Sequence, residues 1–213
     1  MSRRAEPTKE HRPGKDLRER GAAGVALIAL SPVFAVCIVA IRAEAMFRQE
    51  ARGPVFFREK RMARGRVIEL LKFRTLTASA LASLGPGPTH IARLEEQGML
   101  TGTGRVLKKW YLDELPQLWN IVRGDMGLIG TRPYPIELYE AELARGITRK
   151  RDMPTGLIGP VQAHKGATDG RSDVDLDLEY WEEYRTASGS RLLRIDLGIV
   201  ARSLKVQLEH RGL

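Results

Sequence analysis

Cysteine is almost absent from this chain of 213 residues, in which Cys37 is the only one. A single cysteine excludes an internal disulfide framework and any metal site built from several thiolates. It fits a reducing environment on the cytoplasmic side of a membrane. Aromatic residues are also scarce, at 6%. Proteins that bind nucleic acid strands interleave aromatic and basic side chains, so this composition argues against a nucleic-acid partner.

Charge is absent from one long segment, GAAGVALIALSPVFAVCIVAI, between Gly21 and Ile41. Its length matches the roughly 20 residues that a helix needs to cross a bilayer. It could be a secretory signal peptide, a spanning helix or a re-entrant hairpin that enters and leaves on one face. The signal peptide is disfavoured, because the apolar run is longer than usual and Arg42 stands before the cleavage-like Ala43-Glu44-Ala45.

Ser31 and Pro32 lie at the midpoint of this segment. Proline has no N–H and clashes with the preceding turn, so a break in the helix is expected there, with Ser31 bonding a freed backbone group. Basic residues flank both ends, at Lys15, Arg18, Arg20, Arg42, Arg48 and Arg52. A spanning helix normally has its positive excess on one side only. We therefore favour the re-entrant hairpin, with a kinked span as the alternative.

Positive charge dominates the rest of the chain. Lysine and arginine number 35 against 26 acidic residues, which gives a net charge of +9. Such an excess predicts an anionic partner. Because the basic residues are densest between Arg42 and Arg74, beside the apolar segment, anionic membrane lipids and phosphate-rich substrates are favoured.

The predicted fold is α+β and mostly helical. We expect a mobile basic tail over residues 1–14, a re-entrant membrane helix with a break over 15–45, and a compact cytoplasmic catalytic domain over 46–213. Short strands are expected at 55–57 and 67–71 around a basic turn at 62–66, then a loop over 78–100 that contains Gly-Pro-Gly-Pro and ends in a helical turn or two. Helices are expected at 112–122, ended by Gly124, at 133–146, and from Leu192 to Leu208. The last helix is basic and amphipathic, so it is either interfacial on an anionic membrane or packed on the core.

The most informative stretch is LDELPQLWNIVRGDMGLIGTRP, from Leu112 to Pro133. It resembles the signature of the bacterial sugar transferases, the small monotopic phosphoglycosyl transferases. The resemblance extends over nearly the whole chain after residue 14. Its further matches are Ser31-Pro32, Gly53-Pro54-Val55-Phe56-Phe57, Lys72-Phe73-Arg74-Thr75, Pro154-x-Gly156, Gln162, Asp177-x-x-Tyr180 and Asp196-Leu197.

The resemblance implies a two-step transfer of a sugar 1-phosphate from a UDP-sugar to a polyprenyl phosphate such as undecaprenyl phosphate. Asp113 would attack the sugar-bearing phosphate and release UMP, and Glu114 would handle the proton of the lipid acceptor. Neighbouring helical side chains diverge by about 100°, so these two carboxylates are not interchangeable. A Mg2+ ion contacted by Asp113 would offset repulsion between anions. The implied location is the bacterial inner membrane, at the first membrane step of a polysaccharide or glycoconjugate pathway.

Four cations are predicted to bind substrate phosphate. Lys72 and Arg74 share one face of an extended segment. Arg132 stands between Thr131 and Pro133 and offers a planar fork. Lys108 replaces a family arginine and keeps its charge. Asp177 and Asp196, by contrast, are expected to be structural partners of nearby cations.

Several positions depart from the family pattern. Asp16 and Glu19 stand where an arginine and an aspartate are expected, and Tyr111 replaces a serine that would form a capping box with Glu114. Thr131 replaces a proline. The Asp113-Glu114 pair is intact, which disfavours the alternative of a catalytically silent membrane scaffold. A homodimer remains open.

Overall fold

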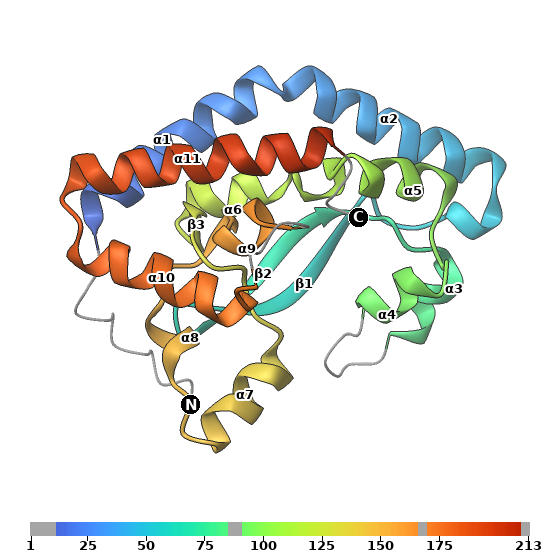
Figure 1. Cartoon of the computed structure of the whole chain (residues 1–213). Coiled ribbons are helices and arrows are strands. Elements are labelled where there is room, and N and C mark those ends of the chain that lie inside the picture. The colour runs from blue at the N-terminus through green and yellow to red at the C-terminus, as the bar shows by residue number, and fades with distance from the viewer. Residues whose placement is uncertain (1–11, 85–90, 166–169, 210–213) are drawn as a thin grey trace. The chain divides into compact units, whose positions relative to one another are not determined.

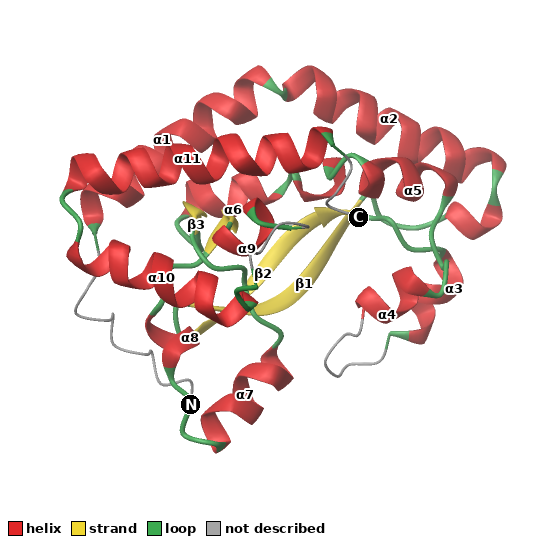
Figure 2. Cartoon of the chain, viewed as in Figure 1, coloured by secondary structure: helices red, strands yellow, loops and turns green. Residues whose placement is uncertain are grey.

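The structure is a computed structural model that describes residues 12–84, 91–165 and 170–209. Helices account for most of these residues, and the strands form two separate two-stranded sheets (Figure 2). The predicted class, α+β and mostly helical, is confirmed. Most of the predicted tail and the Gly-Pro-Gly-Pro sequence at 85–88 lie outside the described residues, although Pro13 and Gly14 are already helical.

The chain divides into two compact units. Unit 1 comprises Met1–Ala23, Arg61–Ile68 and Ile121–Leu213, and unit 2 comprises Gly24–Lys60 and Glu69–Asn120. The divisions fall within helices and strands that continue from one unit into the other.

A broken helix opens the described chain (Figure 1). Helix α1 runs over Pro13–Ala29 and α2 over Ser31–Phe47, with Leu30 between them and Pro32 in the first turn of α2. The Ser31 hydroxyl donates to the carbonyl of Ile28 at 2.8 Å, so the predicted break and its serine bond are both confirmed. Among the described helices none is by itself long and apolar enough to cross a membrane, whereas this pair, bent by 60°, meets that criterion jointly.

Unit 2 contains one long helix, several short ones and the open end of a hairpin whose tip belongs to unit 1. In chain order its elements are α2, a 3-10 turn η1 (Gln49–Ala51), β1 (Phe56–Ala63), β2 (Arg66–Phe73), α3 (Ala78–Ser83), α4 (Ile91–Glu96), α5 (Gly102–Lys109) and a 3-10 turn η2 (Leu112–Glu114). The hairpin confirms both predicted strands. Its tip, Arg64-Gly65, has positive φ at both residues, as a two-residue type I′ turn requires. Helix α3 was not predicted, and the helical turn at α4 was.

The core of unit 2 is built on one face of α2. Cys37 and Ile41 pack with Val55, Phe73 and Leu107. Their spacing along α2 is the four-residue period of a helix face that is buried against a core. The opposite side of the broken helix exposes large apolar residues: Val25, Ile28, Val36, Val39, Met46 and Phe47.

Unit 1 contains the first part of α1, the tip of the hairpin and the end of α6 (Gln117–Arg123). Its later elements are β3 (Gly127–Ile129), α7 (Ile136–Ala144), α8 (Arg149–Asp152), β4 (Gly156–Ile158), α9 (Pro160–Ala163), α10 (Asp173–Thr186) and α11 (Gly189–Leu208). Strands β3 and β4 pair in parallel, with Gly127 opposite Gly156. A Cβ on Gly156 would collide with the backbone of Gly130, which gives a steric reason for glycine in the Pro154-x-Gly156 motif.

The predicted helix ends are partly correct. The helix expected at 112–122 is instead η2 followed by α6, because Pro116 interrupts it, and Gly124 ends α6 with a positive φ. Helix α7 lies within the predicted 133–146, and α11 includes the predicted amphipathic helix. The parallel pair β3–β4 and helices α5 and α10 were not predicted.

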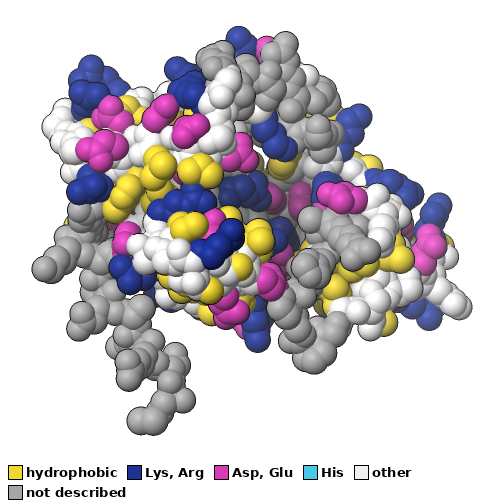
Figure 3. Space-filling model, turned by 60° about the horizontal axis from the view of Figure 1, so that its bottom comes forward, with side chains coloured by type: hydrophobic (Ala, Val, Ile, Leu, Met, Phe, Trp, Pro, Cys, Tyr) yellow, Lys and Arg dark blue, Asp and Glu magenta, His cyan; other side chains and the backbone are white. Residues whose placement is uncertain are grey.

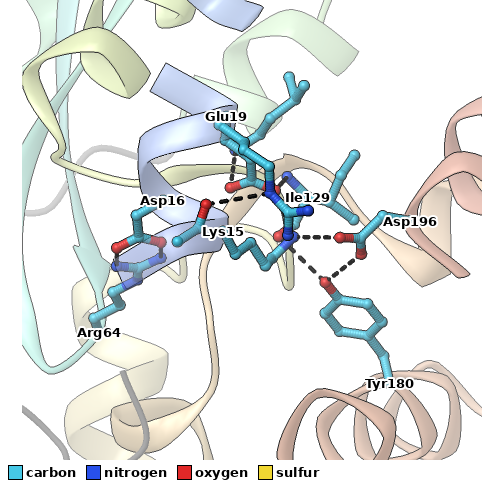
Figure 4. Close-up of polar contacts among 10 residues, drawn as sticks. Lys15, Asp16, Glu19, Arg64, Ile129, Tyr180 and Asp196 are labelled. Carbon is cyan, nitrogen blue, oxygen red and sulfur yellow. Dashed lines mark hydrogen bonds and ion pairs between the residues drawn. The ribbon is translucent and has the colours of Figure 1, made fainter. Parts of the chain in front are cut away.

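A buried ion network fastens the start of α1 to the rest of unit 1 (Figure 4). Lys15 forms ion pairs with Glu19 and, at 2.7 Å, with Asp196. The Glu19 carboxylate accepts from the main-chain N–H groups of Leu128 and Ile129 at 3.0 and 3.1 Å. Tyr180 donates to Asp196 at 2.8 Å. The buried carboxylates are thus paired and hydrogen-bonded, as buried charges must be.

Candidate active site

Asp113 lies on the short turn η2 in unit 2, between α5 and Pro116. Tyr111 precedes η2 in the left-handed region, with φ 55°, and its side chain makes no capping bond. The capping box that a serine would form is therefore absent. A non-glycine residue in this region carries backbone strain, which is most often found at functional turns.

Apolar neighbours remove Asp113 from water. Leu112 and Leu115, on either side of the Asp113-Glu114 pair, pack against the core cluster of Cys37, Ile41, Val55, Phe73 and Leu107. Asp113 is only 7% exposed. This burial, together with the adjacent charge of Glu114, raises the pKa of Asp113 to about 7.

Two lysines oppose that rise and lower the pKa of Asp113, namely Lys72 and Lys108. Lys72 comes from β2 and pairs at 3.0 Å with Glu59 of β1. Lys108 comes from the last turn of α5 and pairs with Glu95 of α4. The predicted phosphate ligands Lys72 and Lys108 are therefore within electrostatic reach of Asp113, each already held by a carboxylate.

Arg74 has different contacts from Lys72 and Lys108. Its side chain is 1% exposed, and its three nitrogens donate to the main-chain carbonyls of Ala51, Pro54 and Leu76 at 2.5 to 2.8 Å. With these donors committed, the geometry favours a structural role for Arg74 over the predicted phosphate contact. The residue fastens the segment before β1 to the end of β2.

Arg132 belongs to unit 1, where its loop is held on both sides. Thr131 forms a parallel bridge with Thr155, and Tyr134 exchanges two main-chain hydrogen bonds with Met62, at 2.8 and 2.9 Å. The backbone on both sides of Arg132 is thus held in place, and the predicted phosphate contact itself stays a prediction.

The sequence did not identify Glu59 and Glu95 as members of this site. Glu59 is 2% exposed and is the one acid in the basic run Arg58 to Arg61, which is a signal that could have been noticed. Glu95 follows a loop and offers no comparable signal. Its carboxylate also accepts from the Thr75 hydroxyl at 3.3 Å and raises the pKa of Asp113.

The described residues hold no cluster of three or more acidic, histidine or cysteine side chains that could bind a metal. Mg2+ is commonly bound by one or two carboxylates together with substrate phosphates and water. Asp113 and Glu114 supply carboxylate oxygens of this kind, so the donor set fits an ion shared with a diphosphate substrate.

Positive charge on the surface is distributed rather than continuous. On the face shown in Figure 3, the described lysine and arginine side chains alternate with acidic and apolar ones. Some other basic side chains are largely buried in ion pairs, such as Arg149 with Glu142 and Lys150 with Asp177. The predictions that Asp177 and Asp196 serve as partners of cations are confirmed.

A family model described as bacterial sugar transferase matches residues 11–210, which is nearly the whole chain. The chain belongs to the bacterial sugar transferase family. Among its relatives, the UDP-glucose:undecaprenyl-phosphate glucose-1-phosphate transferase of Caulobacter vibrioides is 32% identical over 80% of this chain and 66% of its own length. The galactosyl transferase CpsE of Streptococcus agalactiae is 30% identical over 76% of this chain but only 38% of its own length. This sugar transferase thus spans less than two thirds of either relative.

The family departures near the start of α1 have local compensation in this sugar transferase. Glu19, in place of aspartate, reaches the N–H groups of β3. Asp16, in place of arginine, forms two hydrogen bonds of 3.0 Å with the guanidinium of Arg64 at the hairpin tip (Figure 4). Such bidentate pairs are among the stronger polar contacts in proteins.

Proposed function

We propose that this sugar transferase is a phosphoglycosyl transferase that moves a sugar 1-phosphate from a UDP-sugar to a polyprenyl phosphate, with Asp113 as nucleophile. One observation carries the proposal: Asp113 is a buried carboxylate, with a pKa of about 7, that is subject to the charges of Lys72 and Lys108. Perturbed acids near cations are typical of catalytic sites. The names of the relatives supply the substrate class.

In the first step, an oxygen of ionised Asp113 attacks the sugar-bearing phosphorus of the donor. The bond from that phosphorus to the bridging oxygen breaks, and UMP leaves with this oxygen and its negative charge. Lys72 and Lys108 would exchange their carboxylate partners for phosphate oxygens and so neutralise the charge that develops. A phosphosugar ester of Asp113 remains.

In the second step, an oxygen of the polyprenyl phosphate attacks the same phosphorus and the Asp113 carboxylate is released. The acceptor must lose any proton on the attacking oxygen, and Glu114 is the neighbouring carboxylate that can accept it. The products are a polyprenyl diphosphate sugar and a free enzyme with Asp113 ionised again.

The cofactor proposed for this reaction is Mg2+, with Asp113 as its first protein ligand. When bound, it would offset the negative charge of the diphosphate. Asp113, on the turn held by the packing of Leu112 and Leu115, would hold this ion, with Glu114 as the neighbouring carboxylate.

The proposed location is the cytoplasmic face of the bacterial inner membrane, with α1–α2 as a re-entrant element. The 60° bend and the exposed apolar residues of both helices support it. The exposed leucines of α11, Leu193, Leu197, Leu204 and Leu208, support contact of that helix with anionic lipids. A homodimer stays a prediction that light scattering of the detergent-solubilised chain would test.

The topology has a direct test. In a Cys37→Ala background, single cysteines at Leu17 and Phe47, which are 73% and 84% exposed, should be labelled by an impermeant maleimide from the same side of sealed vesicles. A cysteine at Val36, exposed but within the apolar segment, should be protected in both vesicle orientations and serves as the control. Labelling of the two flanks from opposite sides would establish a spanning helix instead.

The activity is tested by UMP release from a panel of UDP-sugars, with polyprenyl phosphate as acceptor. Asp113→Asn should abolish release. Glu114→Gln should retain one turnover of UMP but transfer poorly to the lipid. Normal turnover by Asp113→Asn would remove the nucleophile assignment, and no release with any donor would favour a silent scaffold.

A further inference from the structure

A cleft of about 920 Å3 in unit 1 is lined by residues on and beside α9, α10 and α11. Its volume is in the range of small-molecule sites. Its lining includes neither Asp113 nor any of the four cations predicted to bind substrate phosphate. The cleft therefore shares none of these residues with the proposed active site.

The charges that line the cleft do not cancel. Each lining glutamate has an arginine partner: Arg171–Glu179 at 2.9 Å, Arg191–Glu183 at 2.5 Å and Arg185–Glu182 at 3.6 Å. Arg194 has no ion-pair or hydrogen-bond partner within the described part of the chain, and Arg202 has no carboxylate partner there. Two guanidinium groups on α11 thus retain donors for an anion.

Arg202 is held in place by His164. Its Nη1 lies 2.9 Å from His164 Nε2, and His164 Nδ1 lies 2.8 Å from the carbonyl oxygen of Pro160. Because a guanidinium can only donate, Nε2 accepts and Nδ1 carries the proton that is donated to Pro160. The histidine is therefore neutral in this arrangement and orients the arginine without consuming its charge.

Gly198 lies between the two arginines on the same helix face, since residues 194, 198 and 202 follow the four-residue spacing. Glycine in a helix interior is unfavourable compared with alanine. A Cβ at Gly198 would meet no atom within 4 Å, so packing does not require glycine. Because glycine has no side chain, the surface of the cleft between Arg194 and Arg202 is left open.

We propose that this cleft is a second binding site, which takes a phosphate-bearing ligand whose phosphoryl oxygens contact Arg194 and Arg202 above Gly198. Guanidinium groups suit phosphate because they offer paired N–H donors and a permanent charge. The phosphoryl group comes from either an anionic lipid headgroup or a soluble phosphorylated molecule. The site is independent of the transfer reaction proposed above.

Binding to the detergent-solubilised full chain tests this site, with pyrophosphate as the soluble probe and phosphatidylglycerol in mixed micelles as the lipid probe. Calorimetric titration and the thermal unfolding midpoint are the readouts. Arg194→Ala combined with Arg202→Ala should weaken binding by roughly tenfold or more for each arginine. Lys205→Ala, which removes one charge from the same helix outside the cleft, should bind as the wild type does.

A second pair of variants distinguishes a specific loss of binding from a loss caused by misfolding. Gly198→Glu should abolish binding by placing a carboxylate on the cleft floor, whereas Gly198→Ala should retain it. A response to pyrophosphate alone identifies a soluble ligand, a response to phosphatidylglycerol alone identifies a lipid, and a response to both supports the shared chemistry. No response to either probe, or equal binding by the double arginine variant, overturns the proposal.

Discussion

Replacement of Asp113 by asparagine should stabilise the fold at alkaline pH and leave its stability nearly unchanged at acidic pH. The side chain is 7% exposed, and burial is the largest cause of its raised pKa, followed by the charge of Glu114. An unfolded chain restores this carboxyl to a pKa of about 3.9. The folded chain therefore binds its proton more tightly than the unfolded chain does.

The magnitude follows from the two pKa values. Below pH about 4, Asp113 is protonated in both states and the substitution matters little. Between pH about 4 and about 7 the unfolded chain loses the proton first, so the stability of the wild type falls as pH rises. At about 1.36 kcal/mol for each unit of pKa, the full difference above pH 7 is about 4 kcal/mol. In a chain of this size that is roughly 8–16 °C in Tm.

Thermal unfolding of wild type and Asp113→Asn at pH 4.5 and pH 8 measures this, since other titrating groups cancel in the difference. Asp175→Asn provides a control of opposite sign. Hydrogen bonds from Ser172 lower the pKa of Asp175, so its contribution to stability is lost only below pH about 4, and that variant should lose a similar amount of stability at pH 8 and pH 4.5. If the difference in stability between Asp113→Asn and the wild type is the same at pH 4.5 and pH 8, then Asp113 is not a buried carboxylate with a raised pKa.

The same ionisation controls catalysis, because only the carboxylate form of Asp113 can attack phosphorus. UMP release should rise with pH through about 7 when donor is limiting. A rate that is constant between pH 5.5 and pH 8.5 would contradict this. Glu95→Gln removes a charge that raises the pKa of Asp113, so it should move this rise to lower pH.

Further substitutions test the packing of the fold. Lys72→Met should cost about 3–5 kcal/mol of stability, because it removes the ammonium that lies 3.0 Å from the buried Glu59 carboxylate. Adding Glu59→Gln should restore most of this stability, as measured by urea unfolding of the single and double variants. Additive effects of the two substitutions would show that the pair contributes little. Arg74→Met should cost about 2–4 kcal/mol of stability, because three carbonyls lose their hydrogen-bond donors. Little change in stability, together with weaker binding of the UDP-sugar, would instead show that Arg74 contacts substrate. Gly65→Ala should destabilise the type I′ turn by about 1–2 kcal/mol, whereas Gly198→Ala should stabilise α11 by about 1 kcal/mol. If both variants changed the free energy of unfolding in the same direction, the left-handed conformation of Gly65 or the helical conformation of Gly198 would be wrong.

Local patterns in the sequence were sufficient to predict the structural features that depend on neighbouring residues in the chain. The break at Ser31-Pro32 follows from the missing N–H of proline, and the hairpin around Arg64-Gly65 follows from alternating strands beside a turn. The end of α6 at Gly124 was also predicted. In each case the responsible residues are adjacent in the chain.

Features that depend on distant segments could not be predicted from local patterns. The phosphate contact of Arg74 stays a prediction, whereas its three hydrogen bonds to carbonyls of residues 51, 54 and 76 were not foreseen, because only the fold brings these residues together. The pairing of β3 with β4 involves strands of three residues each, too short for a periodic signal. Glu95 approaches Lys108 only through tertiary folding.

Trapping of the intermediate tests the nucleophile most directly. The full chain would be incubated with a reactive UDP-sugar in the absence of lipid acceptor, and its intact mass and peptides measured. We expect a chain heavier by one sugar phosphate on the peptide that contains Asp113, with this adduct absent from Asp113→Asn and lost again when polyprenyl phosphate is added. UMP release that requires both substrates at once, with no adduct on the protein, would contradict it.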